Sequence, residues 1–202
     1  MLETCLRTLG HNLRASPPTG DVWGMVRSYC ACAKALSRAQ ADWSRDLFED
    51  PALAPHAAAM AVAVVGIERD GRAMARCFQR LEAAYLSASP AGDERDEREM
   101  ARTYRVAAEA VFVDGTAARA TWMLGRLAVS PDPLSRTRGA LIARQFVIAG
   151  VPGPAGGIQD ACLAALEAGL VLDSPFSGDL SEAYYASPRR TTRASWARRR
   201  RG

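Results

Sequence analysis

The chain has 202 residues, of which 49% are apolar and 24% charged, so it is long enough for one or two globular domains and is neither disordered throughout nor fibrous. Its formal net charge of +4 is concentrated at one end, because residues 188–202 contain seven arginines and no acidic residue. The remainder is therefore mildly acidic. This gives no support to nucleic-acid binding by the folded part of the chain, and no nucleic-acid partner is expected.

Several classes of site lack the residues that they need. The longest apolar run, 57–67, falls short of the roughly 18 residues of a membrane-spanning helix, and the first residues do not form a secretory signal. The five cysteines have no paired spacing and there are only two histidines. The sequence therefore offers few residues that could form a zinc site or a histidine-based triad. We expect a cytosolic, non-enzymatic protein with no catalytic residue, no metal and no cofactor, whose cysteines are mostly buried free thiols.

Hydrophobic periodicity predicts an all-α protein, with no strand pattern of useful length. An a/d pattern runs from Val22 to Leu47 and is broken at Asp50-Pro51. A second runs from Met60 to Tyr85. These patterns predict two long helices that are joined at 51–55 and lie roughly antiparallel.

A third helical segment begins at the acidic run 93–99 and continues to Leu127. Carboxylates complement the positive end of a helix, and we expect this run to be a solvated first turn. Asp114-Gly115 lies inside the segment and is expected to kink or split it. Six aromatic residues fall on the three patterns and are expected to be core or interface anchors. They are Tyr29, Trp43, Phe78, Tyr85, Tyr104 and Trp122.

The helical signal weakens in the last third of the chain. Two short helices are predicted, at 135–149 and 158–171, with a linker rich in proline and glycine between them. From Asp173 the composition turns to Ser, Pro and Arg, which predicts disorder to the end.

The predicted architecture is an elongated helical hairpin or bundle in three parts. The first is a helical core domain over 1–130, formed by a short leading helix and three long helices. Accessory short helices follow over 131–172, and a disordered, arginine-rich tail over 173–202.

Cys5 and the basic tail are two candidate membrane contacts. Cys5 lies among leucines and is either S-palmitoylated or a buried core thiol. One acyl chain gives only marginal attachment, so a second signal is needed. The tail is one of four things: that second signal, attracted to acidic lipids; a contact for RNA; a nuclear-import signal; or a solubilising end. Its arginines are Arg189, Arg190, Arg193, Arg198, Arg199, Arg200 and Arg201.

Three clusters of residues on the predicted helices follow a known order and spacing. The first consists of Arg27, Tyr29, Ala31, Cys32, Leu36 and Arg38; the second of Cys77, Tyr85 and Ser87; the third of Glu109, Leu124 and Gly125. Together they resemble the herpesvirus palmitoylated tegument protein of cytoplasmic (secondary) envelopment, over residues 2–129. A chain in which Lys34 is the sole lysine is also typical of GC-rich herpesvirus genomes.

The resemblance implies a helical core like that of the ESCRT-III membrane-remodelling proteins, and no enzymatic activity. It also implies a location in the virion tegument and on Golgi membranes of the host cytoplasm, a stable complex with a second conserved tegument protein, and self-assembly. The stretch before the first cluster is shorter than in the family pattern, so the family's acylated cysteine has no aligned counterpart. Either Cys5 takes that role or the sequence lacks the family's start.

A viral apoptosis regulator of the Bcl-2 type is the alternative function. Leu36 with Ala41-Asp42 loosely resembles its death motif, and Asp70-Gly71 with Arg76 its groove-forming segment. The Asn-Trp-Gly triplet expected before that arginine is absent, and the sequence has no fully buried hydrophobic central hairpin. Affinity for a death-motif peptide separates the two functions.

Overall fold

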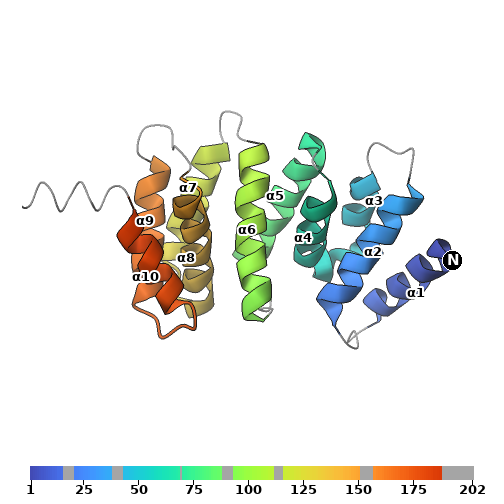
Figure 1. Cartoon of the computed structure of the whole chain (residues 1–202), viewed down its shortest axis with the longest axis horizontal. Coiled ribbons are helices and arrows are strands. Elements are labelled where there is room, and N and C mark those ends of the chain that lie inside the picture. Colours follow the sequence, from blue (N-terminus) through green and yellow to red (C-terminus); the bar gives the residue numbers. More distant parts are fainter. Residues whose placement is uncertain are drawn as a thin grey trace, which may run out of the picture. The chain divides into compact units, whose positions relative to one another are not determined.

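The computed structural model describes residues 1–15, 21–37, 43–68, 70–87, 93–111, 116–150 and 157–187. Regular structure in these ranges is entirely helical, which confirms the all-α prediction (Figure 1). Contacts divide the chain into two units, Met1–Ala84 and Tyr85–Gly202, and the division falls in the last turn of α5 (Gly71–Leu86). The predicted core domain over 1–130 is therefore wrong, because the packing boundary falls inside a helix whose hydrophobic pattern continues across it.

The first unit begins with the short leading helix that the sequence predicts. Its elements are α1 (Leu2–Arg14), α2 (Val22–Leu36), α3 (Trp43–Glu49), the 3₁₀ helix η1 (Pro51–His56), α4 (Ala57–Ile67) and most of α5. Three of them, α2, η1 and α5, start at an aspartate whose carboxylate accepts from backbone N–H groups that have no partner inside the helix. Asp21 accepts from the Gly24 N–H at 2.8 Å, and Asp50 accepts from the Ala52 N–H at 2.9 Å.

The long helix expected over 22–47 is interrupted. α2 ends at Leu36, where the Ser37 hydroxyl donates to the Lys34 carbonyl oxygen at 3.1 Å, and α3 begins at Trp43. Such a side-chain bond to the last helical turn offers the backbone an alternative to continuing the helix. An a/d pattern depends only on which residues are apolar, so it does not predict that a side-chain hydrogen bond ends the helix.

The long helix expected over 60–85 is also broken, between α4 and α5. The backbone of Glu68 is extended, and Asp70 accepts from the N–H groups of Arg72 at 2.9 Å and Ala73 at 3.1 Å. These bonds satisfy the first donors of a new helix, so Asp70 starts α5. The predicted hairpin of two long helices is therefore replaced by four shorter helices and η1.

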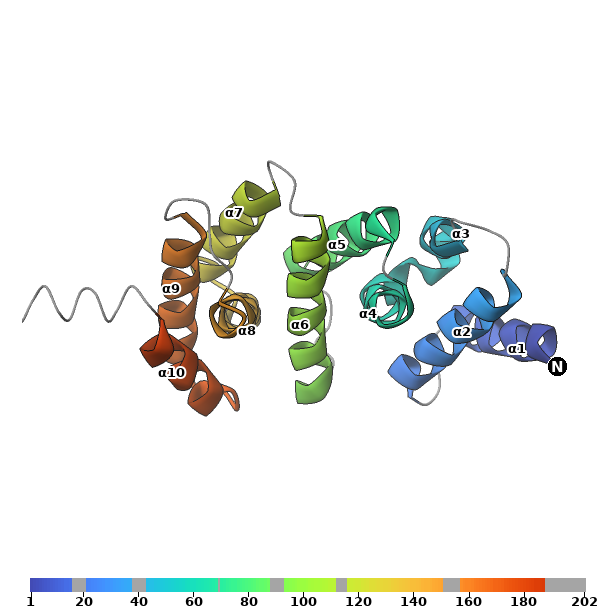
Figure 2. The same cartoon turned by 45° about the horizontal axis from the view of Figure 1, so that its top comes forward.

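α4 lies inside the first unit. Every side chain from Ala59 to Val65 is buried, and the helix contacts α2, α3 and η1 (Figure 2). An apolar helix without a polar face is typical of one surrounded by protein. Among the described residues no single helix has the length and apolar composition to span a membrane; α3 and Pro51–Ile67 meet that criterion only as a pair, bent by 95°.

The second unit is organised around the helices that the sequence predicts as accessory. Its helices are α6 (Glu94–Ala110), α7 (Thr116–Ala128), α8 (Pro133–Ile148), α9 (Gly157–Leu170) and α10 (Ser177–Ala186). α8 contacts α6, α7, α9 and α10, so the accessory role predicted for 131–172 is wrong. Gly169 permits the close approach of α9, because a Cβ there would overlap Ala140 of α8.

Two predictions from the sequence concern this unit: the split of the third helical segment and the disorder from Asp173. Their outcomes differ. The third helical segment is split between Ala110 and Thr116, as expected, although Asp114-Gly115 lies outside the described residues. The disorder predicted from Asp173 is wrong up to residue 187, because α10 forms there. The buried side chains of Leu180 and Ala183 in this helix, and of Phe176 just before it, recur at helical spacing, a pattern that average composition conceals. The tail arginines at 188–202 lie outside the described residues.

Five of the six predicted aromatic anchors are buried. In the second unit, the Tyr85 and Tyr104 ring centroids lie 5.9 Å apart and those of Tyr104 and Phe146 6.4 Å apart, both edge to face. Trp122 is the exception, with 50% of its surface exposed and the Arg126 guanidinium over its ring. The helical periodicity of α6 does not continue across the break before α7. A hydrophobic pattern extended from α6 therefore does not predict which face of α7 is buried.

The acidic run at the start of α6 is not solvated throughout. Glu97 is 4% exposed and Arg138 of α8 is 2% exposed. Arg138 Nε donates to Glu97 Oε2 at 2.9 Å, and its Nη2 donates to Glu97 Oε1 at 2.7 Å. Glu97 therefore joins α6 to α8 as half of a buried, bidentate ion pair, which corrects the prediction for this carboxylate.

Asp132 caps the central helix α8 and carries a pH-dependent part of its stability. Its carboxylate accepts from the Ser135 hydroxyl at 2.6 Å, the Ser135 N–H at 2.9 Å and the Leu134 N–H at 3.3 Å. The Ser135 hydrogen bonds lower the pKa of Asp132. A lowered pKa stabilises the fold above the ordinary value of about 3.9, and this contribution is lost as the pH falls through the lowered value.

We expect Asp132→Ala to lower the free energy of unfolding at pH 7 by about 1 kcal/mol, because the cap is removed. At a pH below the lowered pKa the same substitution should cost less, since the wild-type carboxylate is then protonated. Urea unfolding over a series of pH values from 7 downward measures both values. Asp132→Asn is the control that keeps a capping oxygen without a titrating group. An Asp132→Ala cost that does not change with pH would contradict the assignment.

Candidate functional site

The α1–α2 pair forms one wall of the candidate site. Gly10 of α1 faces Tyr29 of α2 so closely that a Cβ would lie 3.1 Å from the Tyr29 ring, and Tyr29 is buried there. Arg14 Nη2 lies 2.6 Å from Asp50 Oδ2, and the His56 Nε2–H donates to the Leu13 carbonyl oxygen at 2.8 Å. α1 is therefore fixed both to α2 and to the segment around η1.

A groove of about 450 Å³ opens between α1, α2 and α3, all within the first unit. It is lined by Leu6, Tyr29, Ala33, Leu36, Ser37, Trp43, Asp46 and Leu47. The lining is mainly apolar and aromatic, and its size falls within the range of about 300–1,000 Å³ that is typical of ligand pockets. Leu36 is 38% exposed at its margin, so one large apolar side chain is accessible from solvent.

Some charged side chains around this groove form ion pairs and others do not. Lys34 Nζ lies 2.5 Å from Glu68 Oε2, and the Trp43 indole N–H donates to the same oxygen at 3.2 Å. Lys34 also lies 5.4 Å from the centre of the Trp43 ring. Asp46 is exposed and has no ion-pair partner among the described residues, so the groove presents one accessible negative charge.

The cysteines separate into two classes. Cys30, Cys77 and Cys162 are buried, and burial raises the pKa of each thiol to about 12. Cys5 is exposed and Cys32 is partly exposed. The interpretation of Cys5 as a buried core thiol is therefore wrong, and its side chain is accessible to modification.

Of the three family-like clusters, only the first contributes residues to the groove. In the first cluster Tyr29 and Leu36 line the groove, Cys32 lies close by, Arg27 and Ala31 are exposed, and Arg38 lies outside the described residues.

No residue of the other two clusters lines the groove. Cys77 is buried in the first unit, whereas Tyr85 is buried in the second and Ser87 is exposed. In the third cluster Glu109 pairs with Arg105 on α6, and Leu124 is buried beside Gly125 in α7.

No protein family, curated protein or solved structure matches this chain. Over the described ranges there is also no cluster of three or more His, Cys, Asp or Glu side chains that could hold a metal ion.

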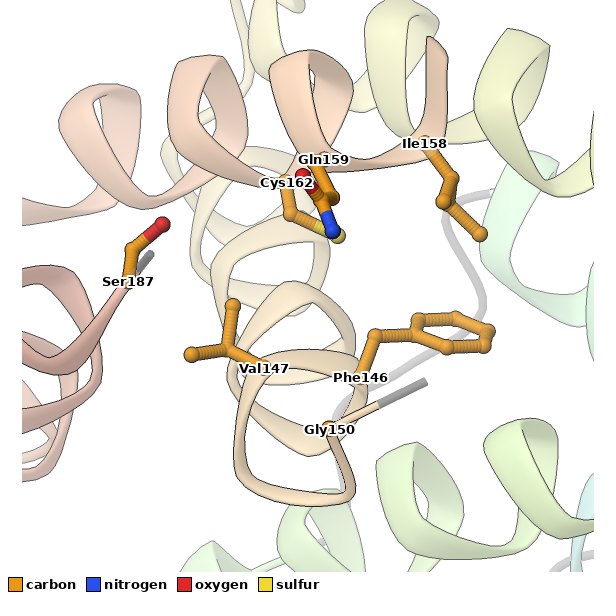
Figure 3. A pocket seen from close by; sticks show the side chains of 7 residues that line it. All are labelled: Phe146, Val147, Gly150, Ile158, Gln159, Cys162 and Ser187. Carbon is orange, nitrogen blue, oxygen red and sulfur yellow. The ribbon is translucent and has the colours of Figure 1, made fainter. Parts of the chain in front are cut away.

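A second cavity lies in the second unit, between the end of α8, the start of α9 and the residue after α10. Figure 3 shows the Phe146, Val147 and Cys162 side chains around it, with Ser187 on the opposite side. Its volume of about 70 Å³ is far below that of ordinary ligand pockets. The cavity has room for a few water molecules at most, so the groove is the stronger candidate site.

Sequence patterns did not reveal the groove. Its lining comes from three helices, and the same a/d positions would be apolar if the helices met without leaving a gap. Two features of the sequence could have pointed to the groove: Leu6 next to Cys5, and Leu36 in the first family-like cluster. Both are ordinary residues of an amphipathic helix until the helices are placed together.

Proposed function

We propose that this protein is a non-enzymatic structural adaptor of the herpesvirus tegument, acting in cytoplasmic envelopment and egress of virions. The observation that carries the proposal is the accessible apolar groove between α1, α2 and α3, next to an exposed cysteine. A groove of this kind accepts the apolar face of an amphipathic helix. Binding, rather than bond chemistry, is what such a surface does.

The proposed occupant is an amphipathic helix of the second conserved tegument protein. Its apolar side chains would contact Leu6, Leu36 and Leu47, and a basic side chain would lie opposite Asp46. Complementary charge at the margin of an apolar groove sets the orientation of the bound helix and speeds association more than it adds affinity.

Membrane attachment in this proposal is peripheral and weak. An acyl chain on Cys5 would enter the surface of Golgi-derived membrane, and the arginines of the tail would add attraction to anionic lipids. Cys5 precedes the groove residue Leu6, so acylation and partner binding would use neighbouring parts of α1. The adaptor would thus hold its partner at the membrane that becomes the virion envelope.

Leu36→Glu should weaken binding of the second tegument protein about tenfold or more, because it places a carboxylate in the apolar part of the groove. Leu86→Glu is the matched control: Leu86 is 42% exposed at the end of α5, close to the 38% of Leu36, and does not line the groove. Co-expression followed by size-exclusion chromatography and calorimetric titration measures the complex. Absence of a complex with the wild-type chain, when both proteins are folded, would overturn the proposal.

The same titration also tests two other occupants. A peptide with a Bcl-2-type death motif that binds the wild-type chain but not Leu36→Glu would support the apoptosis regulator instead. A concentration-dependent dimer lost in Leu36→Glu, without binding of the tegument partner, would assign the groove to a second copy of this chain. Either result would count against the tegument partner as the occupant.

A further inference from the structure

Three helices of the first unit meet at one carboxylate beside the groove. Glu68 directly follows α4, and its Oε2 accepts from Lys34 Nζ of α2 at 2.5 Å and from the Trp43 indole N–H of α3 at 3.2 Å. Its other oxygen, Oε1, accepts from the Asp70 N–H at 3.4 Å. The carboxylate is therefore held by a cation and by a backbone donor at the point where it binds Trp43.

Trp43 connects this carboxylate to the groove. Its side chain lines the groove and is 4% exposed. A buried indole N–H needs an acceptor, and Glu68 Oε2 supplies one. The Lys34 ammonium lies 5.4 Å from the centre of the same ring, so one cation contacts both the ring and its acceptor. Since α3 has only seven residues, tertiary contacts of this kind fix its position more than its own helical hydrogen bonds do.

We propose that Lys34 and Glu68 are positioning residues of the groove: they hold Trp43 in its wall, and loss of the Lys34 charge loosens the wall and weakens docking of an amphipathic helix. The docking part rests on the proposed function, whereas the effect on Trp43 is a property of this chain alone. Lys34 is the sole lysine of the sequence, so acylation of lysine side chains has one target, next to the groove. Acetylation there would remove the charge.

The exposure of this ion pair separates a positioning role from a merely structural one. The Lys34 and Glu68 side chains are 41% and 22% exposed. Ion pairs with this access to solvent contribute little to the free energy of unfolding. Loss of the Lys34 charge should therefore leave the urea unfolding midpoint nearly unchanged while the surroundings of Trp43 change. A merely structural role would lower the midpoint without a separate effect on Trp43 in the folded protein.

The purified full chain is labelled with 5-fluorotryptophan and measured by fluorine NMR without a partner. Its four tryptophans give four resonances, and Trp43→Phe assigns the resonance of Trp43. Lys34→Gln and Glu68→Ala should shift and broaden this resonance. That of Trp122, which is 50% exposed in the second unit, should stay in place. Lys34→Arg keeps the charge and should keep the wild-type Trp43 resonance.

Acetylation of the folded wild-type protein removes the charge without depending on the folding of a variant. The deprotonated Lys34 amine attacks the carbonyl carbon of the N-hydroxysuccinimide ester of acetic acid. An amide bond forms, the N-hydroxysuccinimide anion leaves, and one amine proton goes to the buffer. The N-terminal amine reacts as well, so Lys34→Arg treated in the same way is the control. The Trp43 resonance should move in the wild type and stay in Lys34→Arg.

Calorimetric titration with the second tegument protein measures docking. Lys34→Gln and acetylation should each weaken it about fivefold, the contribution of one ordinary hydrogen bond. Arg45→Gln is the matched control, since it breaks an ion pair on α3 whose residues do not line the groove, and it should change neither measurement.

An unmoved Trp43 resonance in Lys34→Gln, an equal loss of affinity in Lys34→Arg, or a moved resonance with unchanged affinity would overturn the positioning role. A wild-type chain that binds no partner overturns the proposed function instead, and the Trp43 resonance, measured without a partner, still decides whether Lys34 and Glu68 position Trp43.

Discussion

Glu97→Leu is expected to lower the free energy of unfolding by about 3–5 kcal/mol, the largest stability effect expected of any single substitution proposed for this protein. The reason is the buried pair of Glu97 and Arg138, which joins α6 to α8 in the second unit. Removing the carboxylate leaves the guanidinium charge in an interior where its side chain is only 2% exposed. An uncompensated buried charge costs far more than the attraction of the intact pair contributes.

Tyr85 lies within the same cluster and reports on it. The Arg138 guanidinium is 5.9 Å from the centre of the Tyr85 ring. Burial, followed by the nearby Glu97 carboxylate, raises the pKa of Tyr85 well above its ordinary value. Losing Glu97 would therefore disturb the packing of Tyr85 on Tyr104 as well as the ion pair.

The double variant Glu97→Leu with Arg138→Met should recover most of the loss, because both charges are then absent from the interior. Denaturant unfolding of the wild type, both single variants and the double variant gives the coupling between the two side chains. Glu97→Gln is the milder single variant if Glu97→Leu does not fold. A double variant as unstable as the worse single variant would show that the pair is not the source of the effect.

Glu99→Leu is the matched control on the same helix. Glu99 is partly exposed and pairs with the exposed Arg102 at 3.9 Å. Surface pairs of this kind contribute about 0–1 kcal/mol, so the control should change stability by less than about 1 kcal/mol. Equal losses at Glu97 and Glu99 would contradict the buried-pair assignment.

Cys5→Ser should remove nearly all incorporation of a palmitate analogue in cells, to about a tenth or less of the wild-type label. Cys5 is the one exposed cysteine, Cys32 is only partly exposed, and the thiols of Cys30, Cys77 and Cys162 are buried. A single acyl chain supports only reversible binding, so the membrane-bound fraction should fall with the label while the remaining attachment depends on salt.

Metabolic labelling, membrane flotation and imaging of Golgi localisation measure these quantities together. Cys32→Ser is the matched control, since Cys32 is the other cysteine that is not buried. It should retain the label. If neither label nor localisation changes in Cys5→Ser, the anchoring part of the proposed function fails, whereas the partner-binding groove is tested separately by Leu36→Glu.

Parts of this fold can be derived from local sequence because the physics is local. The helices near 135–149 and 158–171 were predicted close to their observed bounds, since proline, glycine and apolar spacing mark them within a few residues. Buried Tyr29 and Tyr104 were predicted for the same reason. The break at Asp70 has a local cause too, an aspartate that caps α5, but the a/d pattern concealed it.

The candidate site could be predicted only in fragments. Cys5, Cys32 and Leu36 were each identified from sequence, but their relation to a groove was not. A lining residue such as Leu47 belongs to a different helix from Leu36. The hydrophobic pattern of neither helix determines the angle between the two helices. The position of Cys5 among leucines suggested acylation, whereas the structure supplied its exposure.

By itself, the sequence determined the all-α class, the positions of most helix ends and the apolar face of several helices. These follow from hydrogen bonds and side-chain spacing within a few residues of each other. Only the tertiary structure decided that Glu97 is buried against Arg138, that Trp122 is exposed, and that Cys5 is exposed. Each outcome depends on which helices pack together, and an amphipathic pattern specifies a face without specifying its partner.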